Sequence, residues 1–424
     1  MKDIYQELEW RGLICQATDS DHLQPWLMEG SRTVYCGFDP TADSLHVGSL
    51  VPLMYLRRFQ QFGHRPIALV GGATGMIGDP SGKSKERNLL SEEALRANVA
   101  GMEKQMRAFL DFDGPNAAQL VNNYDWMSEF SFLEFLRVIG KNAPVNVMLA
   151  KDSVKNRLET GLSYTEFSYM LLQAYDFVHL FRSFDCRLQI GGSDQWGNVT
   201  AGIDLARRMD SVQLYGMTCP LLTKSDGTKM GKTEDGTVWL DPTRTSPYAF
   251  YQYWIGVDDG DVGNCLRMLT DLNREEIESL DAARQQNPEE KASQRRLAES
   301  LTELVHGKTG LEAARNATKT LFAGGPLAQM DESQLAEISA DVPSLELSRA
   351  ELEAGISLID ALRLSGLVES NSVGRRTIQE GGAYVNNHRE SDIKRTLTPA
   401  DLLGDSMILL RRGKKKYALL RFAS

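Results

Sequence analysis

Residues 33–49 read TVYCGFDPTADSLHVGS, an apolar β-forming run followed by a polar turn that contains Pro and Gly. The apolar residues of Thr33–Phe38 are nearly continuous, which predicts a strand buried on both faces. A helical pattern, Val51–Gln61, follows the turn. A junction of this kind presents backbone N–H groups and the positive end of a helix dipole to an anion. The stretch therefore predicts the first strand and the first ligand-binding turn of a parallel α/β fold.

Similar apolar runs recur along the first half of the chain and alternate with helical patterns. Further strands are predicted at Pro66–Val70, Gln119–Asn122, Arg187–Ile190 and Leu214–Leu221, and further helices at Ser91–Leu110 and Ser131–Ile139. This alternation favours a doubly wound parallel sheet, a Rossmann-like domain over residues 1–245, with ligands beyond the carboxyl ends of the strands. Gly- and Asp-rich turns fall at those ends: Gly37–Pro40, Gly71–Gly75 and Gly191–Asp194.

The second half of the chain has a different pattern. Helix starts are predicted at Ser246-Pro247, at a capping box formed by Asn273 and Glu276, and at Asn287-Pro288-Glu289. We expect an α-helical domain over 246–322, a linker over the acidic, weakly patterned 323–354, and a small α+β domain over 355–424. In the last domain we expect helices at Leu358–Leu364 and Val373–Glu380 (the second capped by Gly381-Gly382), a strand at Ala383–Asn386 and a hairpin of Met407–Arg412 with Tyr417–Phe422.

Charge and composition restrict the classes of function. The net charge of −10 argues against a general polyanion binder, but residues 371–424 carry eleven Lys/Arg and five Asp/Glu, a local charge of +6 that leaves −16 for the remaining chain. A basic tail on an acidic body is typical of a protein that holds nucleic acid by one end. No apolar run approaches the roughly 18 residues of a membrane span, and no signal peptide is recognised, so we expect a cytoplasmic protein. The five scattered cysteines form no Cys-x-x-Cys, so neither a zinc ribbon nor a disulfide framework is indicated.

Two short motifs carry the candidate chemistry. His46 of the first turn can donate a hydrogen bond to phosphate, and Gly48 lets a ligand approach the backbone. The segment Lys229-Met230-Gly231-Lys232-Thr233 is a cationic loop that could close over a triphosphate and stabilise departing pyrophosphate. Taken alone, the first motif is better explained as a surface histidine on a loop and the second as a solvated basic turn. The segment Gly78–Ser84 is not a Walker A loop, because three residues rather than four separate its glycines.

Together the two motifs resemble the HIGH and KMSKS signatures of class I aminoacyl-tRNA synthetases. Longer strings resemble the bacterial tyrosyl-tRNA synthetase family over essentially the whole chain: Tyr35–Thr41, Gly71–Pro80, Tyr164–Tyr169, Gln173–Asp176 and Gly191–Asn198. Two positions depart from the signatures. Ser49 stands where the first ends in histidine, and Gly-Lys-Thr stands where the second has Ser-Lys-Ser.

The resemblance implies that the chain activates L-tyrosine with ATP and Mg²⁺ and transfers it to tRNA(Tyr), with no metal site of its own. It implies that the phosphates are bound by His46, Ser49, Lys83, Arg87, Lys229, Lys232 and Thr233. It implies that the nucleotide also contacts Gly37, Asp39, Thr41, Gly48, Gly192, Asp194 and Leu222. For the amino acid, it implies that Tyr35 and Asp176 read the phenol, that Asp79, Tyr169 and Gln173 accept from the ammonium group, and that Gln195 meets the carboxylate.

The resemblance also implies an S4-type RNA-binding module and a homodimer. The module's candidate phosphate contacts are Arg375, Arg376, Arg411, Arg412, Lys414, Lys415 and Lys416. Candidate contacts to the tRNA acceptor stem are Lys151, Lys155, Arg207 and Arg208, and candidate dimer-interface residues are Tyr164 and Phe167. Two subunits would then share one tRNA.

Two alternatives remain open from the sequence. A tryptophanyl-tRNA synthetase has the same fold and signatures, but it lacks the pair Tyr35 and Asp176. A catalytically weakened paralogue that only binds structured RNA is favoured by Ser49 alone. Exchange of pyrophosphate with ATP distinguishes the three possibilities. It depends on tyrosine in a tyrosyl-tRNA synthetase, depends on tryptophan in a tryptophanyl-tRNA synthetase and does not occur in a protein that only binds RNA.

Overall fold

The computed structural model describes residues 2–81, 91–155, 157, 161–233, 236–322, 344–404, 406–413 and 416–423. Two compact units are present: residues 1–244 with 254–305, and residues 245–253 with 306–424. The helical segment 246–322 is therefore divided between the two compact units. The expected boundaries of functional domains at residues 245 and 322 stay a prediction. Within the described residues, no helix has both the length and the apolar content that crossing a bilayer requires.

A six-stranded sheet organises the first unit, in the order β1-β6-β5-β2-β3-β4. The strands are β1 (Gln16–Ala17), β2 (Thr33–Phe38), β3 (Arg65–Val70), β4 (Gln119–Asn122), β5 (Cys186–Gly192) and β6 (Tyr215–Cys219). β2 to β6 run parallel, and only the short β1 is antiparallel to its neighbour. The chain order reverses between β2 and β5, the switch point at which such sheets bind ligands. The predicted doubly wound parallel sheet is therefore confirmed.

Strand limits follow local chemistry. β2 has its predicted bounds and pairs in register with β3 from Thr33 opposite Arg65 to Phe38 opposite Val70. The strand predicted to reach Leu221 ends earlier, at Cys219, where Pro220 follows. Proline has no backbone N–H to donate to the ladder, so the pairing stops there.

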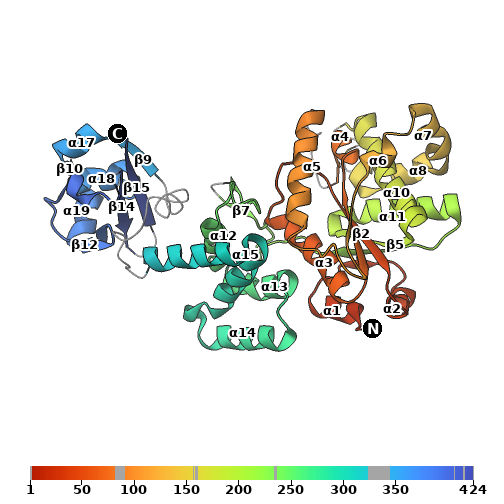
Figure 1. The fold of residues 1–424 in the computed structure, drawn as a ribbon, viewed down its shortest axis with the longest axis horizontal. Helices are drawn as coiled ribbons and strands as arrows, with labels where there is room; N and C mark the ends of the chain where they lie inside the picture. The colour runs from red at the N-terminus through yellow and green to blue at the C-terminus, as the bar shows by residue number, and fades with distance from the viewer. Residues whose placement is uncertain are drawn as a thin grey trace. The chain divides into compact units, whose positions relative to one another are not determined.

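Helices cover both faces of this sheet (Figure 1). They include α1 (Ile4–Trp10), α2 (Ser20–Met28), α3 (Leu50–Gln61), α5 (Glu92–Met106), α10 (Tyr164–Phe184) and α11 (Trp196–Asp210). The helices α3 and α5 lie on one face, while α11 packs along α10 on the other. Further helices are α4 (Thr74–Ile77) after β3, and α6 (Tyr124–Met127), α7 (Phe132–Val138), α8 (Val145–Leu149) and α9 (Asp152–Lys155) between β4 and α10.

The helical segment begins as predicted. It contains α12 (Pro247–Ile255), α13 (Asp259–Leu269), α14 (Arg274–Gln286) and α15 (Ala292–Phe322). The Ser246 hydroxyl accepts a hydrogen bond from the backbone N–H of Ala249 at 3.1 Å, as an N-cap does. Gly307, at φ +73° and ψ 177°, interrupts the helical geometry of α15.

Two details of the predicted helix starts are wrong. Asn273 caps α14 by accepting from the backbone N–H of Glu276, but the Glu276 carboxylate accepts from Arg296 Nε at 2.7 Å. The predicted capping box is therefore only half formed, because a tertiary ion pair recruits its carboxylate. The signal at Asn287 produces a 3₁₀ turn, η4 (Pro288–Glu290), and α15 starts only after the left-handed Lys291.

A five-stranded sheet, in the order β12-β11-β14-β15-β9, forms the core of the second unit. Its elements are β9 (Ser344–Ser348), α17 (Arg349–Ala354), α18 (Leu358–Leu364), α19 (Asn371–Gln379), β11 (Ala383–Val385), β12 (His388–Glu390), β14 (Met407–Arg412) and β15 (Lys416–Ala423), while β10 (Ile356–Ser357) pairs with β13 (Thr396–Leu397). The predicted helices, strand and hairpin are present. Gly381, at φ +69°, ends α19 as predicted.

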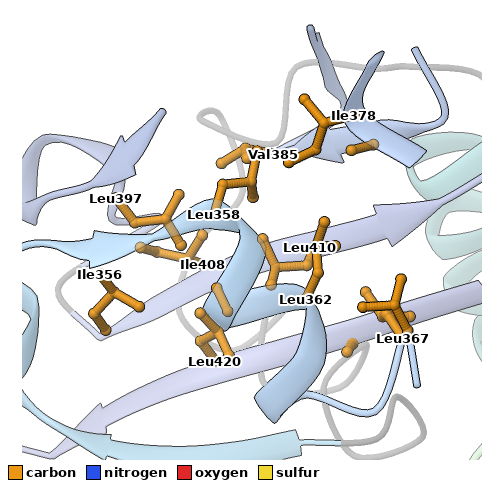
Figure 2. Packing of buried hydrophobic residues seen from close by; sticks show 14 of the residues in the cluster. Ile356, Leu358, Leu362, Leu367, Ile378, Val385, Leu397, Ile408, Leu410 and Leu420 are labelled. Carbon is orange, nitrogen blue, oxygen red and sulfur yellow. The ribbon is translucent and has the colours of Figure 1, made fainter. Parts of the chain in front are cut away.

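Figure 2 shows the apolar core of this unit. Leu358 and Leu362 of α18 pack with Ile408 and Leu410 of β14 and with Leu420 of β15, all fully buried. The two-helix layer on a small sheet is thus stabilised by burial of aliphatic side chains.

The linker predicted over 323–354 is wrong from residue 344 onward. β9 runs parallel to β15, with Leu345 opposite Leu420 and Leu347 opposite Phe422, and α17 follows with a complete capping box between Ser348 and Glu351. Only two leucines alternate with polar residues in β9, so the period-2 signal was too short to stand out from the acidic stretch. Pairing with β15, distant in sequence, decides the strand.

Candidate active site

A cleft of about 300 Å³ opens at the carboxyl ends of β2, β5 and β6, at the switch point of the sheet. It brings together the predicted amino-acid-binding residues Tyr35, Asp79, Tyr169, Gln173, Asp176 and Gln195. The predicted nucleotide-binding and catalytic residues in its wall are Gly37, Asp39, Thr41, His46, Gly48, Ser49, Gly192, Asp194, Leu222 and Lys229. Of the other predictions, Lys83 and Arg87 lie outside the described residues. The backbone of Lys232 and Thr233 forms β7 against β8 (Gly236–Thr237), and their side chains are outside the description.

One end of the cleft is buried and built around Tyr35 and Asp176, each 1% exposed. The Asp176 carboxylate accepts hydrogen bonds from Asn123 Nδ2 at 3.0 Å and from Trp126 Nε1 at 2.9 Å. Burial raises the pKa of Asp176 to about 7, against these two bonds. The Tyr35 hydroxyl is buried without a hydrogen-bond partner among the described residues. Burial, and then the charge of Asp176, raise the pKa of this hydroxyl well above 10. The pair is a neutral phenol beside an acceptor, which suits a ligand hydroxyl.

Sequence reasoning missed Asn123, Trp126 and Gln189. Asn123 is fully buried; its Oδ1 accepts from the backbone N–H of Ala73 at 2.7 Å, and its Nδ2 also donates to Thr74 Oγ1 at 3.1 Å. Gln189 lies opposite Tyr35 in the β2–β5 register, 2% exposed, and its Oε1 has no partner among the described residues. Two signals were available: Asn123 directly follows the strand β4, and Gln189 is a lone amide within the buried strand β5.

Carboxylates form the middle of the cleft wall. Asp39 accepts hydrogen bonds from the Tyr169 hydroxyl at 2.9 Å and from Thr74 Oγ1 at 2.8 Å. Asp39 is expected to contact the nucleotide and Tyr169 the amino acid, so one hydrogen-bonded network joins residues of the two predicted binding sites. Asp79 is 7% exposed and accepts from Gln195 Nε2 at 2.8 Å and from the Ser81 backbone N–H at 2.9 Å. Several buried hydrogen-bond acceptors in one part of the wall suit the binding of an ammonium group.

The His46 turn shows a contact of Gly48 in addition to its predicted one with a ligand, which stays a prediction. The backbone N–H of Gly48 donates to His46 Nδ1 at 2.9 Å, so a neutral His46 ring carries its proton on Nε2 as a donor. A Cβ at position 48 would lie 2.7 Å from His46 Cε1. A side chain at position 48 would therefore displace the His46 ring, a contact that the sequence pattern does not show.

Backbone hydrogen bonds join the His46 turn to the segment that follows the lysine loop. The N–H of Val47 donates to the carbonyl of Val238 at 3.0 Å, and the N–H of Leu240 donates to the carbonyl of Leu45 at 2.9 Å. Lys229 lies on a hairpin, opposite Thr223, and lines the cleft. The two motifs, almost 200 residues apart in the chain, therefore lie at one end of the cleft.

The predicted RNA contacts of the second unit are partly engaged within the protein. Arg375 and Arg376 are exposed on α19, and Arg376 pairs with Glu380 at 3.5 Å. The Arg411 guanidinium lies over the Tyr384 ring at 3.6 Å, and Arg412 donates to the carbonyl of Leu367 at 2.9 Å. Lys416 is exposed at the start of β15, whereas Lys414 and Lys415 lie outside the described residues.

The remaining predicted contacts lie in the first unit. Lys151 donates to Thr200 Oγ1 at 2.7 Å, and burial lowers its pKa. Arg207 and Arg208 both pair with Asp204, while Lys155 is exposed. Of the predicted interface residues, Tyr164 is 63% exposed, whereas Phe167 packs partly buried against Met148 and Met170.

A parallel sheet whose switch point carries a histidine turn, a lysine hairpin and a buried amino-acid-sized pocket defines a class I aminoacyl-tRNA synthetase. The family model described as tRNA synthetases class I (W and Y) matches residues 28–323, and that of the tyrosine–tRNA ligase SYY-like C-terminal domain matches residues 334–420. The second match includes part of the segment first expected to be a linker.

Relatives narrow the class to one amino acid. The tyrosine–tRNA ligase of Rhodopirellula baltica is 59% identical over 99% of this chain and 96% of its own length, and that of Roseiflexus castenholzii is 52% identical over 99% and 100%. The crystal structure of a C-terminally truncated mitochondrial tyrosyl-tRNA synthetase from Aspergillus nidulans matches at a TM-score of 0.70 and 32% identity, covering 76% of this chain and 95% of that one. The chain belongs to the tyrosine–tRNA ligase family.

Proposed function

We propose that the cleft binds tyrosine with its phenol against Tyr35 and Asp176 and joins its carboxylate to ATP. One observation supports this orientation most: an unpartnered, buried Tyr35 hydroxyl stands beside a carboxylate whose other contacts are already made by Asn123 and Trp126. A substrate phenol gives both groups a partner, whereas phenylalanine leaves them unpaired in a buried site.

At the other end of the tyrosine molecule, the ammonium group is assigned to Asp79, Tyr169 and Gln173. Gln173 Oε1 is buried without a partner among the described residues, so it is an acceptor ready for an N–H donor. The Gln195 amide, held by Asp79 and by Asn198 at 2.9 Å, is assigned to the tyrosine carboxylate. Asp39, Thr41, Gly192, Asp194, Leu222 and Gly37 are assigned to the nucleoside part of ATP.

The chemical step is attack of the tyrosine carboxylate oxygen on the α-phosphorus of ATP. A P–O bond to the amino acid forms, the bond to the β-phosphate oxygen breaks, and pyrophosphate leaves. No protein nucleophile is needed, because the protein aligns the two substrates and stabilises developing negative charge. His46 Nε2 and the Lys229 ammonium are donors at the phosphate end, and Ser49 adds a hydroxyl. Lys83, Arg87, Lys232 and Thr233 keep the roles that the resemblance implies.

ATP enters as its Mg²⁺ complex, and Mg²⁺ neutralises phosphate charge when bound. Among the described residues, no group of three or more His, Cys, Asp or Glu side chains is arranged to hold a metal. Mg²⁺ commonly binds through substrate phosphates with few protein ligands. The ion is therefore assigned to the substrate rather than to the protein.

Transfer to tRNA(Tyr) is assigned to the same cleft, with residues 246–322 and the C-terminal module recognising the tRNA body. Arg375 and Arg376, both exposed, are the simplest test. The double variant R375E/R376E is expected to lower kcat/KM for tRNA charging about 100-fold while tyrosine-dependent exchange of pyrophosphate with ATP stays at the wild-type rate. Equal loss of both activities would contradict the assignment.

A homodimer is assigned to the apolar face formed by α7, α8 and the start of α10. Phe132 is 65% exposed, Leu133 77%, Val145 58% and Tyr164 63%, a concentration of exposed apolar side chains within one segment. Leu133→Glu is expected to convert a dimer into a monomer in light scattering coupled to size-exclusion chromatography, with Leu364→Glu, 47% exposed in the second unit, as the control. A monomeric wild-type protein would refute the dimer.

A cytoplasmic location of the protein stays a prediction.

The deciding experiment is amino-acid-dependent exchange of pyrophosphate with ATP. Tyrosine is expected to support it, tryptophan and phenylalanine far less. Full-length relatedness to tyrosine–tRNA ligases gives no support to a protein that only binds RNA. Absence of exchange with tyrosine would nevertheless overturn the proposed function.

A further inference from the structure

The lysine hairpin contacts a helix that neither signature motif includes. α13 contributes Asp261, which is 5% exposed, and Asp261 Oδ1 accepts a hydrogen bond from the backbone N–H of Ser225 at 2.8 Å. Ser225 lies in the turn of the hairpin, where the N–H of Lys224 donates to the carbonyl of Thr228 at 2.8 Å. Lys229 follows in the returning strand of that hairpin, so Asp261 holds the turn that carries the cleft lysine.

A second contact lies one residue beyond Lys229. The Met230 side chain is 7% exposed, and its sulfur lies 3.8 Å from Cys265 Sγ, which is one helical turn after Asp261 on the same face of α13. The backbone N–H of Met230 donates to the carbonyl of Leu222 at 2.9 Å. Lys229 is therefore exposed between two points at which its hairpin is attached to α13.

The opposite end of α13 is attached to the helices α3 and α1. Arg58 of α3 is 2% exposed and donates to the carbonyl of Thr270, and Arg11, the C-cap of α1, donates to the carbonyls of Arg267 at 2.8 Å and Leu272 at 2.7 Å. The carbonyls of Arg267 and Thr270 lie in the last turn and at the C-cap of α13, where helical N–H donors run out, and Leu272 follows just beyond the helix. α3 begins directly after Ser49, so the helix that starts at the histidine turn also fixes α13.

We propose that Asp261 is a positioning residue for tyrosine activation, which attaches the turn of the Lys229 hairpin to α13 on the side of the cleft where the His46 turn lies. The inference rests on the proposed function and deepens it. A lysine that stabilises charge only in the transition state acts at full strength when its backbone is held in advance. Asp261 touches no substrate group in this scheme and acts through Ser225 and Lys229.

The test measures the first-order rate constant for tyrosyl-adenylate formation in single turnover, together with the Kd for tyrosine. D261A is expected to lower the rate constant about tenfold, the effect of one lost hydrogen bond to a carboxylate, with the Kd for tyrosine within about twofold of wild type. D261N keeps an acceptor oxygen at the same place and is expected to retain most of the rate. D259A is the matched control, because Asp259 lies in the same first turn of α13 but accepts from Gln294 at 2.6 Å.

Hydrogen exchange provides a readout that does not depend on activity. The Ser225 amide is expected to exchange about tenfold faster in D261A than in wild type, and at the wild-type rate in D259A. M230A, which removes the contact to Cys265, is the second variant, and it is expected to slow adenylate formation even if D261A fails to fold. A wild-type rate in M230A or D261A, a parallel loss of tyrosine affinity, or an equal effect of D259A would each overturn the proposal. A wild-type protein that forms no tyrosyl-adenylate would refute the proposed function, whereas the Ser225 exchange rates would still test the attachment.

Discussion

The two ends of the cleft are built in different ways. At the phenol end, Tyr35 and Asp176 are each 1% exposed, and two buried donors from the start of α6, Asn123 and Trp126, orient the carboxylate. At the phosphate end, His46 and Lys229 are exposed on a turn and a hairpin, and what holds them is mostly backbone hydrogen bonding. Recognition of a single substrate hydroxyl requires protein groups that are shielded from water before the substrate binds. Stabilisation of a polyanion requires protein cations that the substrate can reach. Selection and catalysis are therefore separable by substitution.

The strongest expected effect is at Asp176. Asp176→Asn is expected to lower kcat/KM for tyrosine about 1000-fold, because the amide turns an N–H₂ toward Asn123 Nδ2 or Trp126 Nε1 and leaves donors facing donors. Exchange of pyrophosphate with ATP as a function of tyrosine concentration measures it. Asp210→Asn, which alters the ion pair with Arg182 outside the cleft wall, is the control. If D176N kept its selectivity for tyrosine, the proposed difference between the phenol end and the phosphate end of the cleft would be contradicted.

A smaller loss, of a different kind, is expected at Lys229. Lys229→Ala is expected to lower the rate constant of adenylate formation about 100-fold with little change in the Kd for tyrosine, because the lost charge acts on the phosphates in the transition state. Single-turnover kinetics measure the rate constant. Lys224→Ala is the matched control, since Lys224 lies on the same hairpin but is not among the described residues that line the cleft. Equal effects of the two variants would indicate general attraction of ATP rather than placed charge.

Tyr35→Phe is expected to act on selection without loss of stability. Discrimination between tyrosine and phenylalanine, measured as the ratio of kcat/KM values, is expected to fall about tenfold while the KM for ATP is unchanged. The ligand-free protein is expected to be about 1 kcal/mol more stable in chemical denaturation, because the substitution deletes a buried hydroxyl that has no partner among the described residues. Unchanged discrimination would refute the assigned pocket.

The smallest expected effect is the pH dependence of the phenol end. Folding raises the pKa of Asp176 from 3.8 to about 7, so the folded state binds this proton more tightly than the unfolded chain. The contribution of Asp176 to the free energy of unfolding therefore falls as the pH rises from about 4 to about 7. Tyrosine affinity is expected to change in the opposite direction, about fourfold stronger at pH ~8 than at pH ~6.5, because the phenol donates to the ionised carboxylate. Calorimetric titration measures it, and a flat or falling affinity would contradict the ionised acceptor.

Much of the site was predictable because it lies at strand ends. The turns after β2 and β5 contribute Asp39, Thr41, Gly192 and Asp194 to the cleft, where a doubly wound sheet places ligands. The supporting residues were not predictable in the same way. Asn123 and Trp126 contact Asp176 across about 50 residues of sequence, and no local pattern specifies that pairing. Gly48 was assigned to a ligand, although the nearest obstacle to a side chain there is the His46 ring.

The amino-acid sequence by itself determined the class of fold, most element limits and the composition of the cleft, because hydrophobic periodicity and turn residues act locally. Tertiary structure alone decided which carboxylate each donor reaches, that β9 joins the C-terminal sheet and that α13 carries the lysine hairpin. Those outcomes depend on contacts between residues far apart in the chain, such as Ser225 with Asp261, whose free energies local preferences do not contain.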